Sequence, residues 1–208
     1  MKRLCVCLIG LLVIIGFISG CCSWNYSKED FEFTQKELAL FGAYNIGDTI
    51  YFESNLGDID TITVVEISEE KYEGNSCFIS TPPYHNIGIT IKHLPNDRWA
   101  GTSQSEGEEK KITYQSLISI SKHPLAMRTD YSIHFKGFYT MGDSTLGSFQ
   151  KECIVNGKII SDCYKVTHGY PERVTNPDDI EIVYCTAKYG LTAYTNKAGE
   201  TWFLKDLE

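Results

Sequence analysis

The stretch CIVNGKIISDC, residues 153–163, decides the fold. Asn156 and Gly157 stand between two runs of β-branched and apolar residues. An Asn-Gly pair is typical of a two-residue type I′ turn, because both central residues of that turn need a positive φ. The sequence therefore predicts a tight antiparallel hairpin at this point of the chain.

The turn also predicts the register of that hairpin. Val155 lies opposite Lys158, and Ile160 lies opposite Cys153. Continuing the count brings Cys163 opposite residue 150. Because side chains alternate between the two faces of a strand, this register puts the two cysteines on opposite faces and argues against a disulfide between them.

The chain from Ile46 onward has the same character, with β-branched and aromatic runs separated by Gly, Pro, Asn and Asp. The connections are too short for the crossovers that parallel strands need. We therefore predict an all-β, antiparallel sandwich or open barrel, with irregular loops at residues 81–87 and 95–109. The expected strands are residues 49–54, 61–68, 76–80, 88–93, 111–121, 131–139, 148–155, 158–167, 180–186, 191–195 and 201–204.

A second hairpin is predicted at the end of the chain, with residues 196–199 as a four-residue loop and Thr195 opposite Glu200. This register pairs Trp202 with Ala193 on an apolar face. The sequence therefore predicts that Trp202 belongs to the core and not to a ligand site.

One short helix is expected near the beginning of the domain. Thr34 and Glu37 have the spacing of a capping box, the apolar residues Leu38 and Leu40 follow, and Gly42 is typical of a helix end.

The N-terminus has the pattern of an export signal. Lys2 and Arg3 precede an apolar run over residues 4–18, which is shorter than the roughly 20 residues that span a bilayer. The run ends in Ile18-Ser19-Gly20-Cys21, which resembles the lipobox of bacterial lipoprotein precursors. The alternative is an ordinary secretory signal that happens to contain a cysteine.

The resemblance implies that residues 1–20 are removed, that Cys21 is acylated, for example with palmitate, and that the chain is membrane-anchored through its lipid. Two or more acyl chains hold a protein stably on a membrane. We expect residues 21–33 to form a tether and residues 34–208 a single β-rich domain. The acidic Lys28-Glu29-Asp30 resembles a displaced surface-export signal, which favours the outer membrane as the location in the cell envelope.

The charge of the chain makes nucleic acid an unfavourable partner. Removal of the leader takes away Lys2 and Arg3, which shifts the formal net charge from −8 to −10. Binding to phosphates depends on clustered basic residues, and the pair Lys110-Lys111 directly follows three glutamates. We therefore expect no nucleic-acid partner.

The cysteine count indicates neither a disulfide framework nor a metal site. Five cysteines remain after the leader and the lipidation site are set aside, so at least one of them has no partner within the chain. They are Cys22, Cys77, Cys153, Cys163 and Cys185. No cysteine or histidine has the spacing of a zinc motif, and we expect no metal and no cofactor.

The last quarter of the chain resembles small β-rich lipoproteins of gut anaerobes. The residues that carry this resemblance are Asn156-Gly157-Lys158, Asp162-Cys163-Tyr164, Ile182-Val183-Tyr184, Tyr189-Gly190-Leu191, Tyr194, Gly199 and Trp202-Phe203-Leu204. The resemblance implies a structural role for these residues and brings no activity with it.

Residues with catalytic or metal-binding chemistry are few, and a structural interpretation accounts for each. The acidic pairs Asp58 with Asp60 and Asp178-Asp179 suit calcium, but turns favour Asp for its bonds to the backbone. His134 shares a strand face with Ser132, which suits a base and a nucleophile, yet an exposed strand histidine explains it as well. No catalytic motif is present, so no catalytic residue is assigned.

Aromatic residues in or beside the two long loops are the candidate ligand-binding residues: Tyr84, His85 and Trp99. The alternative is that they only cover one end of the sheet. The preferred function is a non-enzymatic binding module on the cell envelope for a protein, peptide, lipid or glycan. A structural component of an envelope assembly and an enzyme with an unrecognised site are the two other hypotheses.

Overall fold

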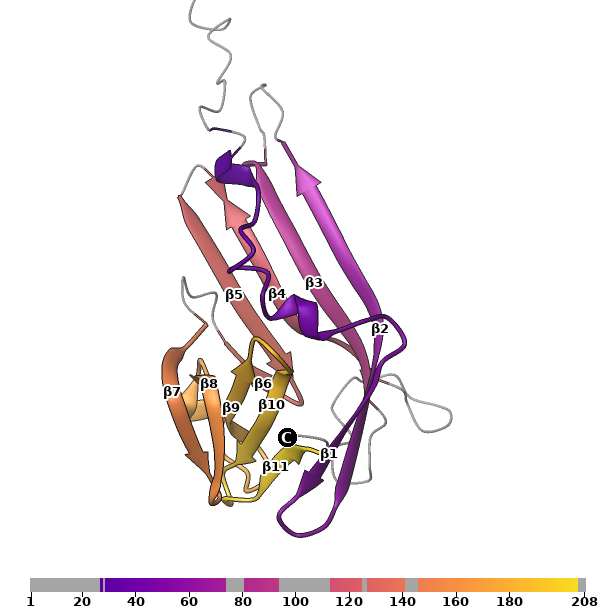
Figure 1. Ribbon diagram of the computed structural model, residues 1–208, viewed down its shortest axis with the longest axis vertical. Helices are drawn as coiled ribbons and strands as arrows, with labels where there is room; N and C mark the ends of the chain where they lie inside the picture. The colour runs from indigo at the N-terminus through magenta and orange to yellow at the C-terminus, as the bar shows by residue number, and fades with distance from the viewer. Residues whose placement is uncertain are drawn as a thin grey trace, which may run out of the picture.

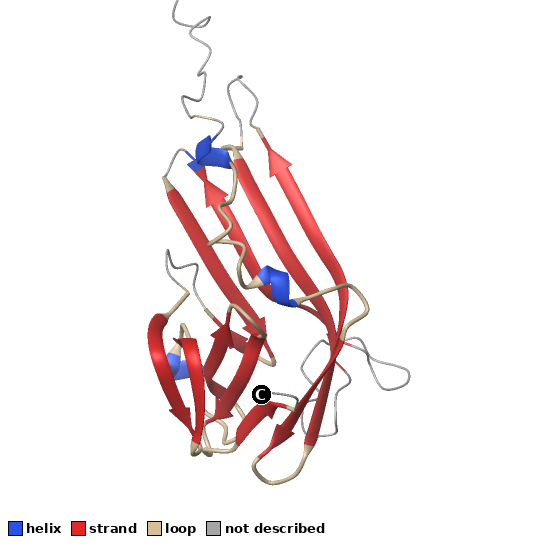
Figure 2. Cartoon of the chain, in the orientation of Figure 1, coloured by secondary structure: helices blue, strands red, loops and turns tan. Residues whose placement is uncertain are grey.

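The structure is a computed structural model that describes residues 27, 29–73, 81–93, 113–124, 127–140 and 146–205. It confirms the all-β prediction. In these residues eleven strands form one antiparallel sheet (Figures 1 and 2). They are β1 Thr49–Ser54, β2 Ile59–Tyr72, β3 Tyr84–His93, β4 Thr113–His123, β5 Arg128–Phe135, β6 Phe138–Tyr139, β7 Ser148–Val155, β8 Lys158–Thr167, β9 Ile180–Thr186, β10 Gly190–Asn196 and β11 Thr201–Leu204.

The sheet has the order β6-β5-β4-β3-β2-β1-β11-β10-β9-β8-β7 and curls into a half-barrel. The long strands β2–β5 form one part, and the shorter strands β7–β11 form the other (Figure 1). The two ends of the sheet approach each other, because the backbone N–H of Gly169, just after β8, donates to the carbonyl of Tyr139 in β6 at 2.7 Å. The open-barrel form of the prediction is therefore the correct one.

Five predicted strands coincide with β1, β7, β8, β9 and β11, and the strand near residues 191–195 lies within β10. The long strands differ more from the prediction. β2 and β3 are longer than expected, and residues 84–87, predicted as loop, belong to β3. They are extended because they continue the ladder to β2, up to the pair Tyr72 and Tyr84. The predicted strand 76–80 and loop 95–109 lie outside the described residues.

The predicted strand over residues 131–139 is wrong, because the chain turns back within it. Lys136 and Gly137 form a two-residue turn with φ of 48° and 80°, and β5 pairs with β6 on either side of it. The sequence Lys-Gly is not a characteristic turn pair, which is why the pattern was missed.

The Asn156-Gly157 hairpin is confirmed, with φ of 46° and 79° at the turn and the expected partners Val155 and Lys158. The predicted alternation of faces is wrong. Asp162 has a φ of 50°, and beyond it the buried face of β8 continues at Cys163. Cys153 and Cys163 therefore lie in the same apolar cluster, both as free thiols.

The last hairpin differs from the prediction by one residue. Thr195 pairs with Thr201, so Trp202 lies opposite Tyr194 rather than Ala193. The register changes because Glu200 belongs to the loop, where its backbone N–H donates to the side chain of Asn196 at 2.8 Å. The burial of Trp202 is confirmed, since its exposed fraction is 0%.

The N-terminal segment runs along the inner side of the long strands (Figure 1). The capping box is present, because the Glu37 carboxylate accepts from the Thr34 N–H at 2.7 Å and Thr34 Oγ1 accepts from the Glu37 N–H at 3.2 Å. The expected α-helix is absent from this described segment, which contains turns and the 3₁₀ segment Phe41–Ala43. A segment this short does not sustain a helix by itself, and contacts with the sheet determine its path.

The packed domain begins before residue 34. Phe31, in the 3₁₀ segment Glu29–Phe31 and in the predicted tether, is only 2% exposed. Another 3₁₀ segment, Pro171–Arg173, follows β8.

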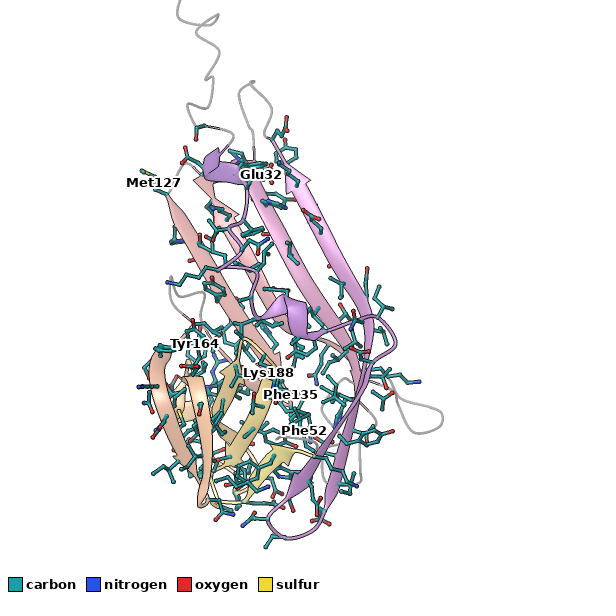
Figure 3. All side chains as sticks on the ribbon, viewed as in Figure 1. Glu32, Phe52, Met127, Phe135, Tyr164 and Lys188 are labelled. Atoms are coloured by element: carbon teal, nitrogen blue, oxygen red, sulfur yellow. The ribbon has the colours of Figure 1, made fainter. Side chains whose placement is uncertain are left out.

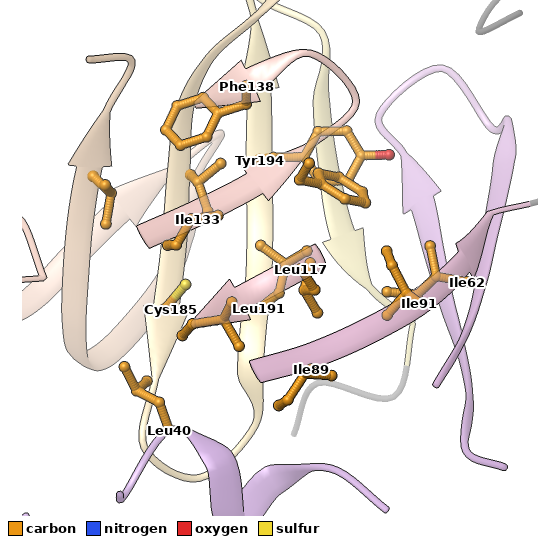
Figure 4. Close-up of a cluster of buried hydrophobic side chains, with 14 of the residues drawn as sticks. Leu40, Ile62, Ile89, Ile91, Leu117, Ile133, Phe138, Cys185, Leu191 and Tyr194 are labelled. Atoms are coloured by element: carbon orange, nitrogen blue, oxygen red, sulfur yellow. The ribbon is translucent and has the colours of Figure 1, made fainter. Parts of the chain in front are cut away.

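The core has two parts. The larger one fills the inside of the curled sheet (Figure 4) and includes Ile62, Ile91, Leu117, Ile133, Leu191, Tyr194 and Trp202. The smaller one lies on the other face of β10 and β11, around Ala193 and Phe203. Within the described residues, no helix has the length and apolar character needed to cross a membrane.

Candidate functional site

A groove lies between β5 and the β7–β8 hairpin, where the two ends of the curled sheet face each other. We call it the edge groove. It has a volume of about 790 Å³, within the range of roughly 300–1,000 Å³ typical of small-molecule sites. Its lining residues are Lys36, Glu37, Ala39, Leu40, Met127, Arg128, Thr129, Tyr131, Leu146, Gly147, Phe149, Tyr164 and Ala187.

Three aromatic side chains give the edge groove its character. Tyr131 comes from β5, Phe149 from β7 and Tyr164 from β8, and Figure 3 shows Tyr164 on the same side of the molecule as Met127. Phe149 is exposed, and its ring meets that of Tyr164 edge-on at a centroid distance of 5.3 Å. Burial, together with the nearby Glu37 carboxylate, raises the pKa of Tyr131 to about 12. The Tyr131 hydroxyl therefore remains protonated and can donate or accept a hydrogen bond.

The N-terminal segment forms one wall of the edge groove, and Glu37 fixes it there. Thr129 of β5 donates to Glu37 Oε1 at 2.9 Å, and Lys122 of β4 donates to Oε2 at 3.3 Å. Burial opposes ionisation of Glu37, but hydrogen bonds from Thr34 and Thr129 and the charge of Lys122 outweigh it. The pKa of this carboxyl consequently lies below its usual value.

The candidate residues from the sequence lie elsewhere. Tyr84 is half-buried at the start of β3, where its hydroxyl donates to Glu70 at 2.7 Å. His85 is 2% exposed, and both ring nitrogens have partners, Nδ1 the carbonyl of Phe31 at 2.9 Å and Nε2 the carboxylate of Glu69 at 2.6 Å. The structure thus places His85 beneath the N-terminal segment, and a ligand role for Tyr84 and His85 stays a prediction. Trp99 lies outside the described residues.

A second cluster, inside the sheet, was not predicted. Asp60 of β2 forms an ion pair with Lys136 of the β5–β6 turn, and both side chains are 1% exposed. His93 of β3 donates from Nε2 to Asp60 Oδ1 at 2.5 Å, and the Tyr194 hydroxyl donates to Oδ2 at 2.6 Å. The sequence interpretation of Asp60 as a turn residue is therefore wrong, because Asp60 lies within a strand and its carboxylate points into the core.

Aromatic rings surround the ammonium of Lys136. Its Nζ lies 5.3 Å from the ring centroids of Tyr194 and Trp202 and 5.5 Å from that of Phe135, and it donates to the Tyr194 hydroxyl at 3.2 Å. Such contacts between a cation and ring faces are favourable when water is excluded. In Figure 3, Phe135 and Phe52 lie close together where the two parts of the sheet meet.

The cluster changes the acidity of its members. Burial lowers the pKa of Lys136 to about 8, although the charges of Asp60 and Glu200 oppose that effect. Burial disfavours the charged form of Asp60, but the hydrogen bond from His93 and the charge of Lys136 prevail, and its pKa falls to about 2. Burial and the Asp60 charge raise the pKa of Tyr194 well above its usual value. Aspartate and lysine are consequently both charged at neutral pH in most molecules.

The other acidic and histidine candidates have structural surroundings. Asp58 lies in the turn between β1 and β2, and the Asp179 carboxylate accepts the backbone N–H groups of Thr175 and Asn176 at 2.8 and 2.7 Å. His134 is half-buried rather than exposed, with its ring edge-on to Tyr139. Across the described ranges, no three His, Cys, Asp or Glu side chains gather as metal ligands would.

Comparisons of the chain with known protein families, with curated proteins and with solved structures find no match.

Proposed function

We propose that this protein is a lipid-anchored protein of the bacterial cell envelope that binds a glycan in the edge groove, without catalysing a reaction on it. The observation that carries the proposal is the edge groove itself, with the aromatic rings of Tyr131, Phe149 and Tyr164 in a volume of about 790 Å³. The membrane anchor is supported by the lipobox that ends at Cys21.

The chemistry of the lining favours a sugar over a lipid or an anionic ligand. Sugar rings have apolar C–H faces that stack on aromatic rings, and hydroxyl edges that bond polar groups. The edge groove supplies both, since the polar side chains Lys36, Arg128 and Thr129 stand beside the three rings. Charges of both signs are present, because Glu37 lies there as well.

The test is a binding measurement with a panel of soluble oligosaccharides, by calorimetry on the full-length protein in detergent. At least one oligosaccharide should bind, and Tyr164→Ala should weaken that binding about tenfold or more, as is common for a central aromatic contact. The matched control is Tyr51→Ala. Tyr51 is an exposed tyrosine of β1 that does not line the edge groove, and its removal should leave the affinity unchanged. No binding to any member of the panel, or equal losses in both variants, contradicts the proposal.

The anchor has a separate test. Cys21→Ser should abolish incorporation of a fatty-acid analogue and release the protein from the membrane fraction. An unchanged membrane-bound product in that variant contradicts the anchor and leaves the glycan site to be judged by the binding measurement.

One observation favours the alternative of an envelope assembly component. The β7–β8 hairpin, at one end of the sheet, exposes the paired residues Ile154 and Ile159 to 76% and 62%. Exposed apolar pairs at a sheet edge are typical of association surfaces. If this is the function, Ile154→Ser with Ile159→Ser should lower the molecular mass of the protein complex in native extracts, while the edge groove is left intact.

A further inference from the structure

The Asp60–Lys136 contact joins parts of the chain that are far apart in sequence. Asp60 lies near the start of β2, and Lys136 lies in the turn between β5 and β6. Both side chains are 1% exposed. An ion pair buried to this degree is often no more stabilising than two apolar side chains of similar volume. The stability gained from charge pairing alone therefore does not explain why a lysine occupies this buried position.

The surroundings of the pair suit a chemical reaction between its two members. The rings of Tyr194, Trp202 and Phe135 enclose the ammonium. A second buried carboxylate, that of Glu200, acts on the charge of Lys136. The pocket that borders Lys136 measures about 110 Å³, below the roughly 300 Å³ of small-molecule sites. The electrophile within reach of the lysine is thus the Asp60 carboxyl group itself.

We propose that Lys136 and Asp60 condense into an intramolecular amide, an isopeptide bond between Nζ of Lys136 and Cγ of Asp60. The ammonium passes one proton to the Asp60 oxygen that it contacts, which leaves a neutral amine facing a neutral carboxylic acid, and the amine attacks Cγ. The bond from Cγ to the protonated oxygen then breaks. That oxygen takes a second proton from the nitrogen and leaves as water. One positive and one negative charge disappear, one water is released, and no oxidant or reductant is required.

The residues around Asp60 fit the roles that this step needs. The hydrogen bonds from His93 to Oδ1 and from Tyr194 to Oδ2 draw charge from the carboxyl and stabilise the oxygen anion that forms as the amine attacks. Contact between the reacting groups supplies the proximity that makes such intramolecular steps fast. The lowered pKa of Lys136, about 8, reduces the cost of moving a proton from its ammonium to the carboxyl group.

The product would lock the curled sheet. The amide closes the chain between residues 60 and 136, which ties β2 to the β5–β6 turn across the inside of the half-barrel. A covalent link over a long loop restricts the unfolded chain, as a disulfide does, but it is not broken by reduction. Exclusion of water by the aromatic rings also protects the bond from hydrolysis.

The experiment is a peptide map of the purified full-length protein after incubation at pH 7 and at pH 9. Trypsin cleaves after Lys36, Lys71, Arg128 and Lys151, but it does not cleave after an acylated Lys136. The expected product is one species in which residues 37–71 are joined to residues 129–151, lighter than the two peptides together by the mass of one water. It should form more slowly at pH 9 than at pH 7, because the ammonium proton that the step passes to the carboxyl group is lost to solvent above the pKa of Lys136, about 8. Separate, unlinked peptides 37–71 and 129–136 at both pH values overturn the proposal.

Two variants sharpen the result. Lys136→Arg keeps the positive charge and should give no linked species. Asp60→Asn should still give the same linked species, because its amide group leaves as ammonia in place of water. If Lys136→Arg does not fold, the wild-type protein decides the question alone. A sample kept in urea from the start should stay unlinked, and a link formed there would show a reaction that does not depend on the fold.

Discussion

Two turns of this protein have nearly the same backbone and opposite side-chain surroundings. At Asn156-Gly157 the φ values are 46° and 79°, and at Lys136-Gly137 they are 48° and 80°. Asn156 is exposed, whereas the side chain of Lys136 is 1% exposed and lies against Asp60. A left-handed conformation costs a residue with a side chain about 1–2 kcal/mol, and asparagine tolerates it best. The comparison shows that Asn156 fits its turn because asparagine tolerates a positive φ. Lys136 fits its turn because its side chain contacts the Asp60 carboxylate.

The largest expected effect comes from making the two turns alike. Lys136→Asn provides the better turn residue, but it leaves the Asp60 carboxylate buried without its cation. We expect a loss of about 3–5 kcal/mol in the free energy of unfolding, measured by urea titration at pH 7 against wild-type protein whose peptide map shows Lys136 and Asp60 unlinked. The control is the double variant Asp60→Leu with Lys136→Met, which removes both charges and should recover most of that loss. A loss below about 1 kcal/mol for Lys136→Asn would mean that the pair contributes little.

The next effect is the energetic coupling between Lys136 and the aromatic rings that surround its ammonium. Trp202 is 0% exposed, stacks on Tyr194 at 5.7 Å and faces the ammonium of Lys136. Trp202→Phe combined with Lys136→Asn should depart from additivity by roughly 0.5–3 kcal/mol, as neighbouring residues do. The same change combined with Asn156→Ala should be additive within about 0.5 kcal/mol, because Asn156 is exposed and its hairpin packs in the smaller core, whereas Trp202 lies in the larger one. Urea titrations of the single and double variants give both values, and equal coupling at the two turns would contradict the comparison.

The contrast between the turns also explains how far the sequence predicts this molecule. The Asn156-Gly157 turn was predictable because its signal is local. The Lys136-Gly137 turn was missed because its reason lies in Asp60, which no local pattern connects to it. The same holds for the face of Cys163, which depends on the positive φ of Asp162 within a strand.

The candidate site shows the same limit. Tyr131, Phe149 and Tyr164 come from three strands that only the curl of the sheet brings together. Composition indicated many aromatic residues, but it did not indicate which of them meet. Tyr84 and His85 are candidates because they lie within a predicted loop, and the extension of β3 through residues 84–87 removes the basis for that prediction.

A smaller effect tests whether the two turn backbones are equivalent. Gly137 and Gly157 both have a positive φ near 80°, and a Cβ at either position would meet no atom within 4 Å. Gly137→Ala and Gly157→Ala should therefore cost the same, about 1–2 kcal/mol each, from backbone strain alone. Thermal unfolding of the two variants makes the comparison. A much larger loss for Gly137→Ala would show that the buried turn is held more tightly than its φ values indicate.

The smallest expected effect is that of Asn156→Lys, the reverse of the first substitution. The new lysine has the same backbone conformation as Lys136, but its side chain extends into water, because Asn156 and both of its neighbours in the turn, Gly157 and Lys158, are exposed. The variant loses only the tolerance of asparagine for a positive φ. We therefore expect its free energy of unfolding to fall by less than about 1 kcal/mol in the same urea titration. The ratio of this loss to that of Lys136→Asn measures how much of the role of Lys136 lies beyond the turn. If Asn156→Lys costs as much as Lys136→Asn, backbone preference governs both turns, and the buried ion pair has no special part in the stability of the fold.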